Sequence, residues 1–403
     1  MIDKNQAKSK FRLILSLLII GFFWPIIGLV LGLAADLAGL GNMGIIVLVL
    51  TFAWLGLFVW LFIELWKGAS GVGVTPWASL WVFFPIIGPF LVGMLILEPL
   101  KYAADDKPEN KRLPYTWSLI KDTWLTYVDN FKTSLKVSHW FVYLFTALGA
   151  LTGLTSYFKP DWVPLAAGIL MIPVVIGSLW ISLMLLKQQI ALENKETPIL
   201  DIKTNNRDLW SYLLIVLLTT LIAAGPLFLS VIMIMIPIFA GSWSDVITMM
   251  QMGDIDSFSS LIPSLGTAIL SLVGLVLMFP AWLWLIYKST IWNNLTMPLF
   301  VTEKIKGYNA LKTCETMARH RWWGLFWKNQ MSGLIFGGYA LMISLGMNVA
   351  GVILGMMLKS FNQGPVIAEL LGNALNGVVQ MITMPLLIMF TLKLFRAFRR
   401  TSE

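Results

Sequence analysis

Long apolar segments alternate with short polar ones along the whole chain. Each apolar segment has about 20 or more residues, enough for an α-helix to cross a hydrocarbon core about 30 Å thick. The segments are continuously apolar, which favours membrane helices over barrel strands of alternating polarity. The pattern predicts an all-α polytopic membrane helix bundle of about nine hydrophobic helices, at 13–34, 43–66, 77–99, 135–155, 164–186, 209–240, 264–287, 331–358 and 366–392.

Composition agrees with a membrane protein. Of the 403 residues, 58% are hydrophobic and 12% are charged, whereas an average soluble domain is about 25% charged. A net charge of +8 in a soluble protein would suggest nucleic acid as a partner. Here the basic residues flank membrane segments, so we attribute the charge to topology and expect no nucleic-acid partner.

The distribution of lysine and arginine predicts the orientation. Four polar segments, at 99–136, 187–208, 288–328 and 393–400, hold 22 of them, while the three intervening loops hold two. Cytoplasmic loops accumulate basic residues, so the sequence predicts a multi-pass protein of the bacterial inner (plasma) membrane with a cytoplasmic C-terminus. The loop after residue 240, which contains Asp245, Asp254 and Asp256 and no base, is expected outside.

We divide the chain into an N-terminal region, 1–100, with three hydrophobic segments, and a six-helix membrane domain, 101–403. Because both ends of the first region are basic, three full crossings cannot join them on one side. Either the N-terminal charges are translocated, or the segment at 77–99, which contains Pro85, Gly88 and Pro89, re-enters the membrane. The second region is interpreted as three repeats of an amphipathic segment plus two helices, in which Lys101, Lys187, Lys288 and Lys393 end membrane helices.

Two amphipathic segments are predicted to lie in the membrane interface. In 115–132 a helical stripe contains Trp117, Ile120, Trp124, Tyr127, Val128 and Phe131. In 307–328 the apolar side contains Tyr308, Leu311, Ala318, Trp322 and Leu325. Tryptophan favours the headgroup level and basic side chains pair with phosphate, so anionic lipid headgroups are the expected partners. The predicted lipid-interface residues are Trp117, Trp124, Lys304, Lys306, Lys312, Arg319, Arg321, Trp322 and Trp323. A passive collar that orients the next helix is the alternative.

The second segment also carries a resemblance. The stretch NNLTMPLFVTEKIKGYNALKTCETMARHRWWGLFW resembles prokaryotic multi-pass families related to the membrane domain of glycerophosphoryl diester phosphodiesterases, and the matching residues are Pro298, Glu303, Ala310, Leu311, Lys312, Arg321, Trp322 and Trp323. The phosphodiesterase catalytic domain, with its metal site, has no counterpart in this sequence. The resemblance therefore implies a membrane domain without that enzymatic activity.

Candidate catalytic chemistry is sparse. Cys314, His139 and His320 have no ligand-spaced neighbours, and a zinc site needs three or four converging ligands. No cofactor is expected. Polar residues within the last two helices, Asn348, Asn373, Asn376 and Gln380, are interpreted as interhelical hydrogen-bonding residues. Glycine pairs with small-xxx-small spacing, at Gly28 and Gly32, Gly149 and Gly153, Gly333 and Gly337, and Gly351 and Gly355, indicate close helix packing.

The sequence thus favours a non-enzymatic membrane protein with a structural, lipid-interacting or assembly role. The alternative is a transporter or permease for a small or lipidic substrate. A homo-oligomer or a complex with other membrane proteins stays open.

Overall fold

The computed structural model describes residues 3–37, 43–83, 91–105, 112–158, 163–194, 196, 202–239, 258–358 and 364–402. These residues form helices and no strands. The chain divides into two compact units, unit 1 (Met1–Asp122) and unit 2 (Thr123–Glu403). The sequence placed the division near residue 100, before the first amphipathic segment.

The all-helical prediction is confirmed for the described residues, but the count of nine membrane helices is not. Six helices are long and apolar enough to cross a membrane, and they correspond to the predicted segments at 43–66, 164–186, 209–240, 264–287, 331–358 and 366–392. The segments at 13–34 and 135–155 also lie in helices. The side chains of residues 21–50 and 154–168 lie outside the described part.

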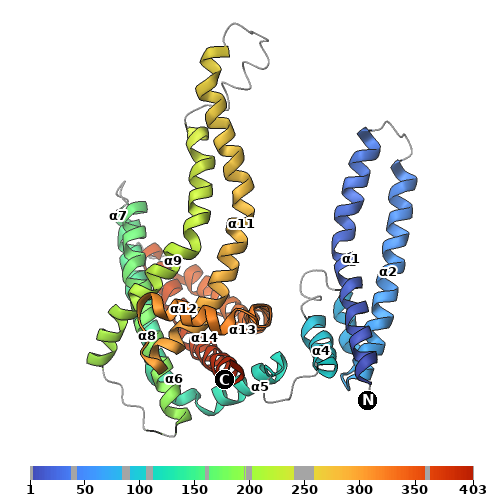
Figure 1. The fold of residues 1–403 in the computed structure, drawn as a ribbon. Coiled ribbons are helices and arrows are strands. Elements are labelled where there is room, and N and C mark those ends of the chain that lie inside the picture. The colour runs from blue at the N-terminus through green and yellow to red at the C-terminus, as the bar shows by residue number, and fades with distance from the viewer. Residues whose placement is uncertain are drawn as a thin grey trace. The chain divides into compact units, whose positions relative to one another are not determined.

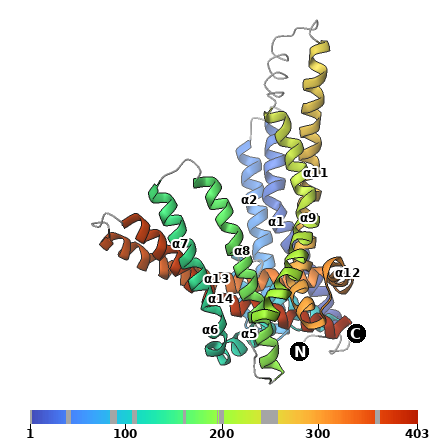
Figure 2. The ribbon, with the colours of Figure 1, turned by 90° about the vertical axis from the view of Figure 1, so that its left-hand side faces the viewer.

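Unit 1 is built on two helices, α1 (Lys4–Leu37) and α2 (Met43–Gly71), which lie side by side (Figures 1 and 2). The 3₁₀-helix η1 (Pro76–Phe83), the π-helix η2 (Gly93–Leu97) and α4 (Glu98–Ala104) follow. Their apolar side chains pack with those of α1 and α2 in one core, which includes Ile14, Leu65, Val82, Ile96 and Leu100. Unit 1 therefore has a hydrophobic core of its own.

The hydrophobic segment at 77–99 is not one continuous α-helix. It begins as 3₁₀-helix, and after residues 84–90, which lie outside the described part, it continues as η2 and α4. Pro85, Gly88 and Pro89 fall in that gap. A 3₁₀ stretch and a π stretch both interrupt regular α-helical hydrogen bonding. The segment therefore differs from an ordinary membrane-crossing helix, although whether it is re-entrant stays a prediction.

The helix α5 (Thr116–Asp129) crosses the boundary between the units. Unit 2 continues with α6 (Phe131–Ser138), α7 (Trp140–Phe158), α8 (Val163–Glu193), α9 (Ile202–Phe239), α11 (Phe258–Glu303), α12 (Gly307–Ala318), α13 (Trp322–Leu358) and α14 (Gly364–Ser402). Two pairings dominate its packing: α7 with α14, and α9 with α11 (Figures 1 and 2).

Close packing of α7 and α14 depends on glycine. A Cβ atom built on Gly377 would lie 2.7 Å from Cα of Val142, and one on Gly149 would lie 2.8 Å from Cβ of Asn373. Gly149 was predicted to pack closely, and the structure identifies α14 as its partner. Cβ atoms built on Gly333 and Gly337 meet nothing within 4 Å, so the structure gives that pair no such packing role.

Proline in α9 explains one contact of the α9–α11 pair. Pro226 has no backbone N–H, so the carbonyl of Ile222 loses its helical donor. The indole N–H of Trp284 on α11 donates to this carbonyl at 3.1 Å. The helix α9 therefore runs through Gly225-Pro226 without interruption, and a side chain of the neighbouring helix satisfies the freed carbonyl.

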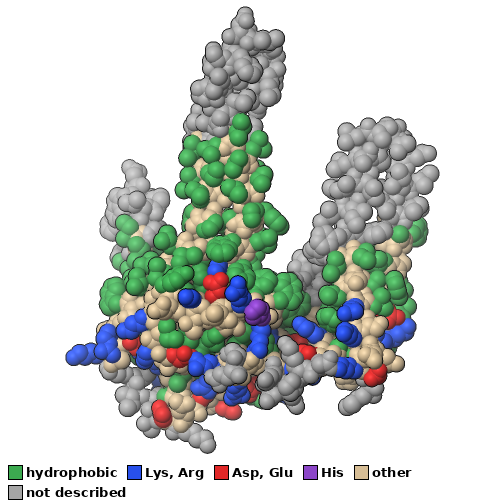
Figure 3. Space-filling model, in the orientation of Figure 1, with side chains coloured by type: hydrophobic (Ala, Val, Ile, Leu, Met, Phe, Trp, Pro, Cys, Tyr) green, Lys and Arg blue, Asp and Glu red, His purple; other side chains and the backbone are tan. Residues whose placement is uncertain are grey.

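The helices continue beyond the lysines that were predicted to end them. Lys187, Lys288 and Lys393 lie within α8, α11 and α14, which end at Glu193, Glu303 and Ser402. At 46 residues, α11 is about 69 Å long, more than twice the thickness of the hydrocarbon core. Figure 3 shows that the charged side chains of unit 2 gather toward one end, while hydrophobic side chains cover the described part of α9 and α11. The lysines therefore mark the start of a polar, helical layer.

Candidate functional site

The polar layer of unit 2 is held together by ion pairs between helices. Arg396 on α14 pairs with Glu193 on α8, and Arg399 pairs with Glu303 at the end of α11. Lys393 donates a 2.6 Å hydrogen bond to the hydroxyl of Thr126 on α5. Lys393 is one of the lysines that the sequence predicted to end membrane helices. The other two in unit 2, Lys187 and Lys288, also contact a second helix, as described next.

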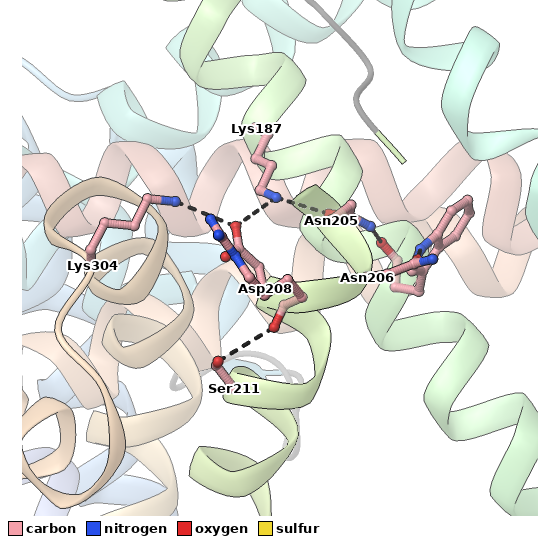
Figure 4. Close-up of polar contacts among 8 residues, drawn as sticks. Lys187, Asn205, Asn206, Asp208, Ser211 and Lys304 are labelled. Atoms are coloured by element: carbon pink, nitrogen blue, oxygen red, sulfur yellow. Dashed lines mark hydrogen bonds and ion pairs between the residues drawn. The ribbon is translucent and has the colours of Figure 1, made fainter. Parts of the chain in front are cut away.

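Asp208 of α9 is the centre of one cluster (Figure 4). Its side chain is 7% exposed, and its Oδ2 lies 2.8 Å from Nζ of Lys187 and 3.4 Å from Nζ of Lys304. Lys187 also donates to Oδ1 of Asn205 at 3.1 Å. The carboxylate thereby joins α8, α9 and the segment that follows α11. Lys304 has a φ of 57°, a left-handed conformation that usually favours glycine after a helix.

Lys288 forms a second cluster in the same layer. It is 5% exposed, and its Nζ lies 2.7 Å from Oε2 of Glu315 on α12. The ammonium also lies 4.4 Å from the ring centroid of Trp284 and 5.1 Å from that of Trp292. Aromatic faces stabilise a cation that has lost water. The lysine therefore fastens α12 to α11.

The junction between α12 and α13 holds a donor-rich site. The side-chain atoms Nη1 of Arg321 and Nε1 of Trp322 are buried and have no hydrogen-bond partner. The ring of Trp322 lies 5.4 Å from that of Tyr287 on α11, and Arg319 acts electrostatically on Tyr287. Both unpartnered atoms are donors only. The junction therefore holds two buried donors whose hydrogen bonds no described residue accepts.

The helix α12 has one buried face and one basic face. Ala310, Leu311, Cys314 and Ala318 are buried, and the helix packs against α9, α11 and α14. Lys306, before the helix, and Lys312 and Arg319 are exposed. Tyr308 was predicted on the apolar side, but it is 61% exposed and shares the helical face of Lys312 and Arg319. The apolar stripe thus packs against protein rather than directly against lipid.

The start of α13 places the two predicted tryptophans differently. Trp322 is partly buried and stacks on Phe326 with ring centroids 5.4 Å apart. Trp323 is 60% exposed. Both residues belong to α13 rather than to the amphipathic helix, because the chain turns at 319–321. The structure thus brings Arg319, Arg321, Trp322 and Trp323 together at one junction.

The amphipathic segment 115–132 also divides. The helix α5 stops at Asp129, and within it Ile120 and Tyr127 are buried, whereas Trp117, Trp124 and Val128 are exposed. The hydroxyl of Tyr127 donates to the carbonyl of Ile382 at 2.8 Å. Trp124 packs edge-on against Tyr339 of α13, with 5.2 Å between ring centroids. The residues of the predicted stripe therefore lie on two faces of α5, one buried and one exposed. Trp117 and Trp124 lie on the exposed face.

Sequence reasoning did not select Asp208, Tyr287 or Glu315. Their partners come from other helices, so no local spacing identifies them. In the sequence, Lys187 and Lys288 stood out only because a lysine recurs at the end of each predicted pair of membrane helices. That recurrence was the one sequence feature that pointed to these two clusters. Within the described residues, no group of three or more His, Cys, Asp or Glu side chains is arranged to hold a metal ion.

Among the described residues, six helices long and apolar enough to cross a membrane are typical of a multi-pass membrane protein. Comparison of the chain with protein-family models, curated proteins and solved structures gives no match.

Proposed function

We propose that this chain is a non-enzymatic, multi-pass protein of the bacterial inner membrane that binds anionic lipid headgroups at the α12–α13 junction. The proposal rests on two buried hydrogen-bond donors at consecutive residues, Nη1 of Arg321 and Nε1 of Trp322, which have no acceptor. A buried polar group without a partner costs roughly 1–3 kcal/mol. A lipid phosphate supplies several acceptor oxygens and a negative charge, so it would satisfy both donors.

The surroundings support a phosphate ligand. Lys306, Lys312 and Arg319 are exposed around the same helix, and they would attract an anionic surface by about 1 kcal/mol each. The exposed rings of Tyr308 and Trp323 suit the headgroup level of a membrane. The site combines long-range attraction by the exposed bases with direct hydrogen bonding by the buried donors.

Native mass spectrometry of the purified protein with phosphatidylglycerol or cardiolipin tests this function. Trp322→Phe removes the indole donor and keeps a ring, and Arg321→Gln removes the charge. Each is expected to lower bound anionic lipid by roughly tenfold or more, since a hydrogen bond to a charged group contributes about 1.5–3 kcal/mol. Trp323→Phe is the matched control and should change little, because it keeps an exposed ring at the headgroup level and removes an indole N–H that is not among the buried, unpartnered donors.

The exposed bases should act in a graded way. Replacing one of Lys304, Lys306 or Lys312 with glutamine should weaken lipid binding modestly and in a salt-dependent way. Replacing these three together with Arg319 and Arg321 should weaken it strongly. A series that is flat and insensitive to salt, with Trp322→Phe indistinguishable from Trp323→Phe, would mean that the charges serve topology alone.

The proposed orientation has a separate test. A Met250→Cys variant is expected to react with an impermeant maleimide only from the outer face of intact cells, because the loop around it carries carboxylates and no bases. The native Cys314 should stay unlabelled in the folded protein. It is fully buried, and burial raises the pKa of its thiol to about 12, so little reactive thiolate forms at neutral pH. Labelling of residue 250 only in inverted vesicles would show that this loop faces the cytoplasm, which is the opposite of the proposed orientation.

A further inference from the structure

A hollow of about 470 Å³ lies between α7, α13 and α14. Its volume falls in the range of small-molecule sites, about 300–1,000 Å³. Phe145, Leu341 and Leu345 supply apolar walls, and the polar side chains are Ser344, Asn348, Asn376 and Gln380. None of the described residues that line it is ionisable.

The polar side chains form two pairs that face one hollow. Ser344 and Asn348 are four residues apart on α13, and Asn376 and Gln380 are four residues apart on α14, so each pair shares one helix face. Asn348 donates to the hydroxyl of Ser344 at 3.3 Å, within its own helix. Among the described residues, no hydrogen bond joins the pair on α13 to the pair on α14. The structure thus gives these amides no role in holding the two helices together, contrary to the interpretation from sequence.

Their position makes the unused hydrogen-bonding capacity costly. Both pairs lie inside segments that are long and apolar enough to cross a membrane, Trp322–Val349 and Glu369–Thr401. Asn348 and Asn376 are exposed at the protein surface. Because segments of this length and polarity are expected to lie in the membrane, an exposed amide within one needs a partner from another molecule.

The chemistry of the hollow restricts the occupant. The absence of ionisable lining groups disfavours a charged headgroup. Amide donors and acceptors beside apolar walls suit a molecule with hydroxyl and ester groups next to acyl chains.

We propose that this hollow binds the uncharged glycerol and ester region of a neutral glycerolipid, with diacylglycerol as the simplest representative. The acyl chains lie along Phe145, Leu341 and Leu345, and the amides of α13 and α14 bond to the hydroxyl and ester oxygens. This site is separate from the anionic-lipid site at the α12–α13 junction and does not depend on it.

Photo-crosslinking tests the proposal. The full-length protein is placed in phosphatidylcholine nanodiscs, without anionic lipid, together with a diacylglycerol that carries a diazirine near its glycerol. Labelled peptides are then mapped by mass spectrometry. Labelling is expected in the α13 and α14 peptides that line the hollow, and excess unlabelled diacylglycerol should suppress it. An anionic phosphatidylglycerol analogue should label the hollow poorly.

Variants separate ligand binding from helix packing. The double variant Asn348→Leu/Asn376→Leu should lower labelling roughly tenfold, because the loss of two amide contacts within a membrane corresponds to about that change. It should keep the melting temperature, since neither amide bonds to another helix. Thr391→Val, also on α14 and bonded only within its helix, is the control and should label normally. Trp322→Phe should also label normally, which distinguishes this site from the anionic one.

Three outcomes would overturn the proposal. The first is labelling that the double variant leaves unchanged, and the second is labelling confined to other peptides. The third is a marked fall in melting temperature of the double variant, which would restore the two asparagines to a packing role.

Discussion

Gly377→Ala is expected to lower the stability of unit 2 substantially. The added Cβ would lie 2.7 Å from Cα of Val142 and 3.0 Å from the carbonyl oxygen of Phe141. Both atoms belong to the α7 backbone, which cannot move aside as a flexible side chain can. Overpacking costs about 1–3 kcal/mol, and we expect the upper end here because whole helices must separate.

The same helix provides a control. Gly372 also lies on α14, but a Cβ atom built on it meets nothing within 4 Å. Gly372→Ala should therefore be neutral or slightly stabilising, since alanine favours a helix over glycine by up to about 1 kcal/mol. Thermal unfolding in detergent, followed by tryptophan fluorescence, compares the two variants. Equal melting temperatures would show that α7 and α14 do not pack at the distance seen in the structure.

Hydrophobic length accounts for what the sequence could predict about the fold. Continuous apolar segments identified the six helices that are confirmed as able to cross a membrane. The pattern could not locate their ends. Beyond Lys288, side chains such as Trp292, Leu295 and Phe300 are again buried, in protein rather than in lipid. Hydropathy does not distinguish those two environments, so the end of α11 was placed 15 residues too early, near Lys288 rather than Glu303.

Tertiary contacts explain why the candidate site was predicted only in part. The bases of 304–321 were visible because they cluster in sequence. Burial of Arg321 Nη1 and Trp322 Nε1 depends on the turn at 319–321 and on the neighbouring α11, which no local pattern reports. Tyr308 was assigned to the apolar face because it is aromatic, whereas helical geometry groups it with Lys312 and Arg319. The sequence shows that Asn376 and Gln380 are polar residues within an apolar segment. It does not show the hollow that they line, because the hollow forms only where α13 packs against α14.

Asp208→Asn is expected to give the largest loss among single substitutions in the polar layer. The carboxylate is 7% exposed, and it is the anionic partner of Lys187, which is 25% exposed, and of Lys304, which is 57% exposed. The amide keeps the shape of the side chain but removes its charge, so Lys187 remains charged beside α9 with only neutral amide oxygens as acceptors. Breaking a fully buried ion pair costs about 3–5 kcal/mol. Because both lysines are partly solvated, we expect on the order of 2 kcal/mol.

Two further variants test whether this loss comes from the buried carboxylate. Glu64→Gln removes the acidic partner of Lys67, which is three residues along the same helix and 57% exposed. Such a local pair contributes only about 0.2–0.5 kcal/mol, so this variant should unfold nearly as the wild type does.

Lys187→Met/Asp208→Leu removes both charges and should be more stable than Asp208→Asn, because no unpaired ammonium is left between α8 and α9. The measurement is the melting temperature of each purified variant in detergent at low and high salt. If Asp208→Asn and Glu64→Gln lose the same small amount, then Asp208 does not hold α8, α9 and the end of α11 together, and the polar layer must be stabilised by the contacts of α12 and α14 instead.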